Sequence, residues 1–183
     1  MNIYFDTEFT GLHKNTTLIS IGMIAENGQS FYAELIDYDK SQCDDWIRKN
    51  IISELLHDNN EIWKEGVADV QLYGMKVDVA FELKKWLRQF STIQFVSDVS
   101  HYDFVLLIDL FGGAFDLPYN VCASCHDINQ DIASYLNISE AEAFDENREE
   151  ILKRAGITIP DGMKHNALYD AKVIKLLYEL MKH

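Results

Sequence analysis

Four acidic residues and one histidine fall into three separate clusters along the chain, and each cluster lies beside strongly apolar sequence. The clusters are Asp6-Thr7-Glu8, a segment from Asp98 to Asp103, and a segment from His165 to Asp170. Carboxylates in apolar surroundings need cations to stay ionised. Acids and a histidine in this order are the groups that hydrolysis of a phosphodiester by two metal ions would use.

The first cluster has the pattern of a β-strand. Side chains on one face of a strand recur at every second position, so Asp6 and Glu8 point the same way, about 7 Å apart. Asp and Glu are also poor strand formers, which makes the pair unusual in a strand covered on both faces. Two carboxylates at this spacing could bracket a divalent cation.

The second cluster combines a strand end with the start of a helix. Asp103 lies near the beginning of a helix expected over residues 101–111, on the same side as its leucines, so it heads a buried stripe. It is either a helix N-terminal acid, which the helix dipole favours, or part of a buried site. Asp98, at the end of the preceding strand, is the competing candidate or a partner that orients its neighbours.

The third cluster spans the start of the last helix. His165 and Asp170 are five residues apart and would lie on different sides of one continuous helix. Asn166 is a good N-cap, so we expect the helix to begin after it, with Asp170 in the first turn on the inner face. His165 then belongs to the preceding loop, where a near-neutral pKa would suit a general base.

The elements that must position these clusters predict an α/β protein. Strands are expected over residues 2–8, 16–25 and 29–35, with an Asn27-Gly28 hairpin turn between the second and third. A further strand is expected over 93–97, and the run from Cys122 to His126 is interpreted as a strand end entering a helix, rather than a haem-attachment or zinc site. Helices are expected over 41–57, 78–90, 101–111, 127–136, 139–154 and 167–182, with capping boxes at Ser41/Asp44 and Ser139/Glu142. The prediction is a mixed five-stranded sheet flanked by helices.

Composition limits the kinds of partner. The chain has 183 residues, is 48% hydrophobic and contains no linker or repeat, so we expect residues 1–183 to form a single domain. A formal net charge of −14 argues against a protein that coats long nucleic acid, although it is compatible with an enzyme acting on strand ends. The basic residues that could still meet a few phosphates include Lys14, Arg48, Lys49 and Lys164.

The sequence also suggests a compartment. The N-terminus has no basic region followed by an apolar run, and no segment has about 18 consecutive apolar residues. Three cysteines are too few for a disulfide framework and fit a reducing environment. We therefore expect a cytoplasmic protein with no membrane partner.

The three clusters together resemble the motifs of the DEDDh, or DnaQ-like, 3′-to-5′ exonuclease superfamily. The matching segments are Phe5-Asp6-Thr7-Glu8-Phe9-Thr10-Gly11-Leu12 with Leu18-Ile19-Ser20-Ile21-Gly22, then Asp98 with Tyr102-Asp103, then His165-Asn166-Ala167-Leu168 with Asp170-Ala171. The three motifs together span nearly the whole chain. Their order and the lengths between them resemble those of proteins with the ribonuclease H-like fold. The compact bacterial 3′-to-5′ exoribonucleases are the most similar members.

This resemblance implies a role for each matching residue. Asp6, Glu8, Asp103 and Asp170 would hold two Mg²⁺ or Mn²⁺ ions, and His165 would take the proton of the attacking water. The substrate would be the 3′ end of single-stranded RNA or DNA, released as nucleoside 5′-monophosphates, with RNA favoured. The resemblance further implies that main-chain groups near Thr7 and Phe9 would grip the terminal sugar, that Leu12 would wedge against the last base, and that Asp98 would position the substrate. A homodimer is also compatible with the resemblance.

The same residues are compatible with other activities. The chain could be a DNA-directed 3′-to-5′ exonuclease or a proofreading-type subunit, because the chemistry does not depend on the sugar. Its first motif also resembles haloacid dehalogenase-type phosphatases, in which Asp6 would be a nucleophile, but there the second acid should be Asp where this chain has Glu8. The tryptophans Trp46, Trp63 and Trp86 are expected in the core or in dimer contacts, because no pattern connects them to the carboxylates.

Overall fold

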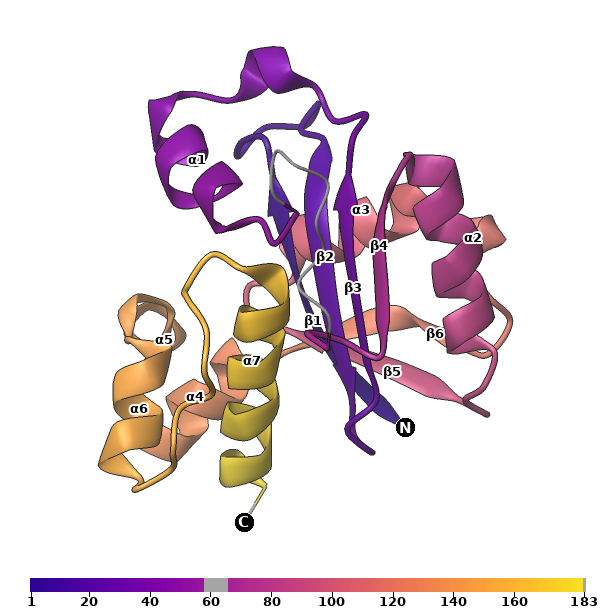
Figure 1. The fold of residues 1–183 in the computed structure, drawn as a ribbon. Helices are drawn as coiled ribbons and strands as arrows, with labels where there is room; N and C mark the ends of the chain where they lie inside the picture. The colour runs from indigo at the N-terminus through magenta and orange to yellow at the C-terminus, as the bar shows by residue number, and fades with distance from the viewer. Residues whose placement is uncertain (58–65, 183) are drawn as a thin grey trace.

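The computed structural model describes residues 1–57 and 66–182, which form an α/β fold built on a mixed sheet (Figure 1). In the described residues the sheet has six strands, in the order β4-β3-β2-β1-β5-β6. The strands are β1 (Asn2–Phe9), β2 (Leu18–Ala25), β3 (Ser30–Leu35), β4 (Val70–Gly74), β5 (Ile93–Ser97) and β6 (Val121–Asp127). The first three strands pair antiparallel, and the other pairings are parallel.

The mixed sheet is confirmed, but the expected count of five strands was wrong. The missed strand is β4, which pairs with β3 at one edge of the sheet. None of its residues is fully buried, because an edge strand is covered only in part, so its sequence lacks a strong apolar signal. The meander of β1, β2 and β3 is as expected, and Gly28 in its turn has a φ of +91° that favours glycine.

Helices cover both faces of the sheet (Figure 1). They are α1 (Asp45–Asn50), α2 (Lys76–Leu87), α3 (His101–Leu110), α4 (Asn129–Leu136), α5 (Glu140–Asp145), α6 (Arg148–Arg154) and α7 (Ala167–Met181). Short 3₁₀ turns lie at Lys40–Gln42, Ile52–Glu54 and Ala114–Asp116. No helix in the described part of the chain has the length and apolar character needed to cross a bilayer.

Two helices differ from the sequence prediction. The helix expected over residues 41–57 is reduced to α1, because the N-cap is Asp44, whose side chain accepts from the Ile47 N–H, and the helix ends at Asn50. The helix expected over 139–154 is two helices. The Ser139 capping box begins α5, but the Asn147 side chain accepts from the Glu150 N–H and begins α6 as a separate helix.

The alternation of β1 divides its side chains between two buried clusters, one on each face of the sheet. Ile3 and Phe5 pack in a buried cluster with α2 and α3, whereas Tyr4 packs in a second cluster with α4, α6 and α7. Both faces of β1 are therefore covered. Asp6 and Glu8 continue the Tyr4 side of the strand, and α7 packs on β1 and β2 from that side (Figure 1).

Candidate active site

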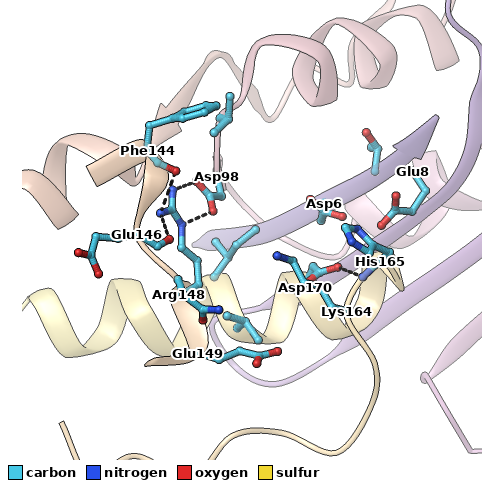
Figure 2. A pocket seen from close by; sticks show the side chains of 15 residues that line it. Asp6, Glu8, Asp98, Phe144, Glu146, Arg148, Glu149, Lys164, His165 and Asp170 are labelled. Carbon is cyan, nitrogen blue, oxygen red and sulfur yellow. Dashed lines mark hydrogen bonds and ion pairs between the residues drawn. The ribbon is translucent and has the colours of Figure 1, made fainter. Parts of the chain in front are cut away.

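Three carboxylates from the first and last motifs meet where α7 crosses β1. Asp6, Glu8 and Asp170 each offer an oxygen atom, and these atoms lie within 4.8 Å of one another. Figure 2 shows these side chains gathered with His165 at one end of a cavity of about 310 Å³. No hydrogen bond or ion pair within the described residues reaches the carboxylates of Asp6 or Glu8. Oxygen atoms grouped in this way suit a hard divalent cation.

The electrostatics of this group favour a bound cation. Burial raises the pKa of Glu8 to about 9, with further contributions from the negative charges of Asp170 and Asp103. Burial raises the pKa of Asp170 to about 7. The pKa of Asp6 also lies well above its usual value, because of burial and the neighbouring acids. Acids that cannot ionise together without added positive charge fit a metal-binding site.

Asp103, the acid of the second motif, belongs neither to this group of oxygens nor to the cavity lining, and protein donors hold it. It is 4% exposed, and its two oxygens accept from Thr7 Oγ1 at 2.5 Å and from Ser97 Oγ at 2.9 Å. Burial raises its pKa to about 7 against the opposing effect of these hydrogen bonds. Its charge is the largest electrostatic contribution to the raised pKa of Asp6, so the two groups act on each other.

His165 lies in the loop before α7, as expected. The Asn166 side chain accepts from the Tyr169 N–H and begins the helix, and His165 has a φ of +68°. The His165 backbone N–H donates to Asp170 Oδ2 at 2.8 Å, which ties the loop to the carboxylate group. Burial, and then the neighbouring Lys164 charge, lower the pKa of the imidazole. The ring is therefore neutral near pH 7 and able to accept a proton.

Trp46 on α1 is a site neighbour that the sequence did not indicate. Its ring meets the imidazole of His165 edge to face, with 5.2 Å between ring centroids. It is 53% exposed, so it is not a core residue and the alternative of a dimer contact stays a prediction, whereas Trp86 is buried as expected. Trp63 lies outside the described residues. Trp46 and His165 are far apart in the sequence, so no short sequence pattern could have predicted their contact.

Asp98 occupies the opposite end of the cavity, where it is paired with Arg148 (Figure 2). Arg148 Nε donates to Asp98 Oδ2 at 2.6 Å, and Arg148 Nη2 donates to Asp98 Oδ1 at 2.8 Å. Asn129 Nδ2 donates to the same Oδ1 at 3.0 Å. The Asp98 carboxylate is therefore engaged by α4 and α6, a role that its position in the sequence did not predict.

The three remaining residues expected to contact substrate differ in their positions. Thr7 lines the cavity, and its hydroxyl is used by Asp103. The Phe9 ring stacks on Tyr102 at 5.3 Å and is absent from the cavity lining. Leu12 lies in the loop after β1, 79% exposed and likewise outside the lining. The structure thus brings Thr7 into the cavity but not the side chains of Phe9 and Leu12, and the implied main-chain contact near Phe9 stays a prediction.

Comparison with known proteins relates this arrangement to nucleases. A family model described as the 3'-5' exoribonuclease Rv2179c-like domain matches residues 1–181. The 3'-5' exoribonuclease Rv2179c of Mycobacterium tuberculosis strain H37Rv is 27% identical over 132 residues, which are 71% of this chain and 73% of that protein. A 3'-5' exoribonuclease of strain CDC 1551 matches with the same figures.

Solved structures share the fold. The nuclease domain of 3'hExo, a DEDDh family member bound to rAMP, matches with a TM-score of 0.67 and 14% identity, covering 99% of this chain and 90% of that one. A full-length 3'-exonuclease matches with a TM-score of 0.62 and 13% identity, covering 99% and 60%. The expected ribonuclease H-like architecture and the resemblance to DEDDh exonucleases are confirmed. Because the family model spans residues 1–181, the chain belongs to the Rv2179c-like 3'-5' exoribonuclease domain family.

Proposed function

We propose that this chain is a metal-dependent 3′-to-5′ exoribonuclease that hydrolyses single-stranded RNA to nucleoside 5′-monophosphates. The observation that carries the proposal is the meeting of Asp6, Glu8 and Asp170, with ligand atoms within 4.8 Å, in a cavity that His165 also lines. Membership of a family described as 3'-5' exoribonucleases supports the direction and the substrate. Residues 1–183 would act as one exonuclease domain.

The residues of the cavity fit divalent cations. Asp6, Glu8 and Asp170 would hold two Mg²⁺ or Mn²⁺ ions, with Asp103 completing the set next to Asp6. When bound, such cations stabilise negative charge on the phosphoryl oxygens and on the leaving 3′ oxygen. Without a cation, burial raises the pKa of Glu8 to about 9 and that of Asp170 to about 7. Cation binding would ionise both carboxyls at neutral pH and release their protons.

His165 would accept the proton of the attacking water. Its imidazole lines the same cavity as the carboxylates, and burial lowers its pKa, which favours the neutral form that can accept a proton. The hydrogen bond from its own backbone N–H to Asp170 fixes the loop, and the Trp46 ring limits the movement of the imidazole. Asp103, held by Thr7 and Ser97, would keep its orientation while substrate enters.

A direct test compares RNA with DNA. Purified protein is incubated with 5′-labelled single-stranded RNA or DNA of the same sequence, with Mg²⁺, with Mn²⁺ or with chelator. We expect a ladder of shortened RNA and nucleoside 5′-monophosphates with either metal, and slower shortening of DNA. Faster shortening of DNA would make the enzyme a deoxyribonuclease. An aspartyl-phosphate trapped on Asp6 would replace the proposal with phosphatase chemistry.

A further inference from the structure

The candidate active site is acidic, yet its proposed substrate is an anion. Asp6, Glu8, Asp98, Glu146, Glu149 and Asp170 all line the cavity. A phosphodiester entering it therefore meets strong repulsion unless positive charge faces it. Bound cations would supply part of that charge. The basic side chains of the lining, Arg148 and Lys164, are the protein groups to consider for the rest.

Arg148 has no hydrogen-bond donor left for a substrate. A guanidinium has five N–H groups. Its Nε and one Nη2 hydrogen bind Asp98, and the other Nη2 hydrogen binds Asn129 Oδ1 at 2.7 Å. Nη1 donates to the backbone carbonyls of Ala143 and Glu146, both at 2.6 Å. Arg148 therefore fixes α5 and α6 against the β5–α3 connection and is not free to bind phosphate.

Lys164 is in the opposite situation. It forms no ion pair or hydrogen bond within residues 1–57 and 66–182, and it is exposed. Figure 2 shows it beside Asp170, at the carboxylate end of the cavity. Its positive charge lowers the pKa of both Asp170 and His165. Of the other basic residues considered from the sequence, Lys14 and Arg48 line different cavities, and Lys49 is outside this lining.

We propose that the Lys164 ammonium binds a non-bridging oxygen of the 3′-terminal phosphodiester, which makes Lys164 a substrate-positioning residue. The inference rests on the proposed function, since it assumes that the terminal phosphodiester lies over Asp6, Glu8 and Asp170. Lysine is suited to this contact because its ammonium is a compact charge on a flexible stem. The contact ignores base identity, so it adds affinity for any RNA sequence.

The test measures RNA binding, in a His165→Ala background that slows cleavage and retains Lys164 and the carboxylates. Fluorescence anisotropy follows a 5′-labelled single-stranded RNA, with Mg²⁺ present. One probe is native, a second has an uncharged methylphosphonate at the 3′-terminal linkage, and a third has it three linkages further in. Lys164→Gln is compared with Lys164→Arg and with Lys85→Gln. Lys85 lies on α2, pairs only with Glu82 among the described residues, and gives the same change in net charge.

We expect Lys164→Gln to weaken binding of native RNA roughly 10-fold, in the range of one charge-assisted hydrogen bond. The slope of log affinity against log salt should decrease by about 0.7, the value for one phosphate of a single strand. The loss should disappear with the terminal methylphosphonate and persist with the internal one. Lys164→Arg should retain most of the affinity, and Lys85→Gln all of it.

Equal effects of Lys164→Gln and Lys85→Gln, or a loss that persists with the terminal methylphosphonate, would overturn the inference. Shortening of RNA by the unmodified protein is measured in parallel. If the unmodified protein shortens RNA but RNA binding does not depend on Lys164, the proposed role of Lys164 is refuted and the exonuclease activity is not. Binding that depends on Lys164, without any shortening, would refute the exonuclease activity and retain the phosphate contact.

Discussion

Gly22→Ala should damage the active site without touching any of its functional groups. Gly22 lies on β2 directly opposite Asp6, at the point where the start of α7 crosses the sheet. A Cβ atom at this position would lie 2.2 Å from the Leu168 backbone N and 2.3 Å from the Ala167 carbonyl carbon. The first of these distances is about 1.2 Å short of the 3.4 Å at which ordinary contact begins. Because the clashing atoms are backbone, no change of rotamer can relieve the contact, and α7 must move.

The expected loss of activity follows from the functional residues at the start of α7. His165 precedes the helix and Asp170 lies in its first turn, so a movement of about 1 Å displaces both from Asp6 and Glu8. A misplacement of this size costs about 10²-fold in rate. Forcing an extra carbon atom into packed structure costs about 1–3 kcal/mol in the free energy of unfolding.

The assay combines kcat/KM for single-stranded RNA with urea denaturation in chelator. Gly74→Ala on β4 is the control, because a Cβ there would meet its nearest neighbour, Asp78 Cβ, at an ordinary 3.6 Å. We expect Gly74→Ala to retain activity and Gly22→Ala to lose about 10²-fold. Activity of Gly22→Ala within about 3-fold of the unmodified protein, with unchanged stability, would refute the reasoning that close packing at Gly22 sets the catalytic geometry.

Three further predictions concern charge. Because the pKa of Glu8 is raised to about 9, the metal-free folded state binds more protons than the unfolded state between about pH 4 and 9. The stability of the metal-free protein should therefore fall as pH rises through that window. Mg²⁺ should raise the melting temperature, measured by calorimetry, more at pH 8 than at pH 5. An equal rise at the two pH values would contradict this prediction. Arg148→Met should cost about 3 kcal/mol in urea denaturation, because it removes the ion pair of a largely buried carboxylate and leaves it only the hydrogen bond from Asn129. Arg154→Met, at an exposed pair, should cost less than about 1 kcal/mol, and equal losses would argue against the Arg148 network. Trp46→Ala should expose the His165 imidazole and raise its pKa, which moves the acid limb of the pH–rate profile to higher pH. An unchanged acid limb would show that Trp46 does not influence the pKa of His165.

The sequence was most informative where local chemistry decides the structure. Alternation along β1 predicted which face carries Asp6 and Glu8, and the turn at Asn27-Gly28 predicted the hairpin. The N-cap preference of Asn166 predicted both the start of α7 and the position of His165 outside it. These features depend on a few neighbouring residues, so their signals are contained in short segments.

Several features that depend on contacts between distant segments were not predicted. β4 is defined by its pairing with β3, and its own residues are too exposed to give a clear pattern. The break between α5 and α6 occurs at Asn147, which is the N-cap of α6. The hydrophobic pattern continues at helical spacing across this break, so the sequence predicted a single helix. Arg148 and Trp46 reach the site from α6 and α1, and nothing near either residue in sequence indicates its partner.

The most direct measurement of the central claim is the shortening of a 5′-labelled single-stranded RNA by the unmodified protein and by Asp170→Asn. Asp116→Asn, an exposed acid outside the cavity lining, is the matched control. With Mg²⁺ the unmodified protein and Asp116→Asn should produce the same ladder from the 3′ end, chelator should abolish it, and Asp170→Asn should be slower by at least about 10²-fold. Shortening by Asp170→Asn at the unmodified rate, or shortening that chelator does not affect, would contradict a metal-dependent nuclease site at these carboxylates.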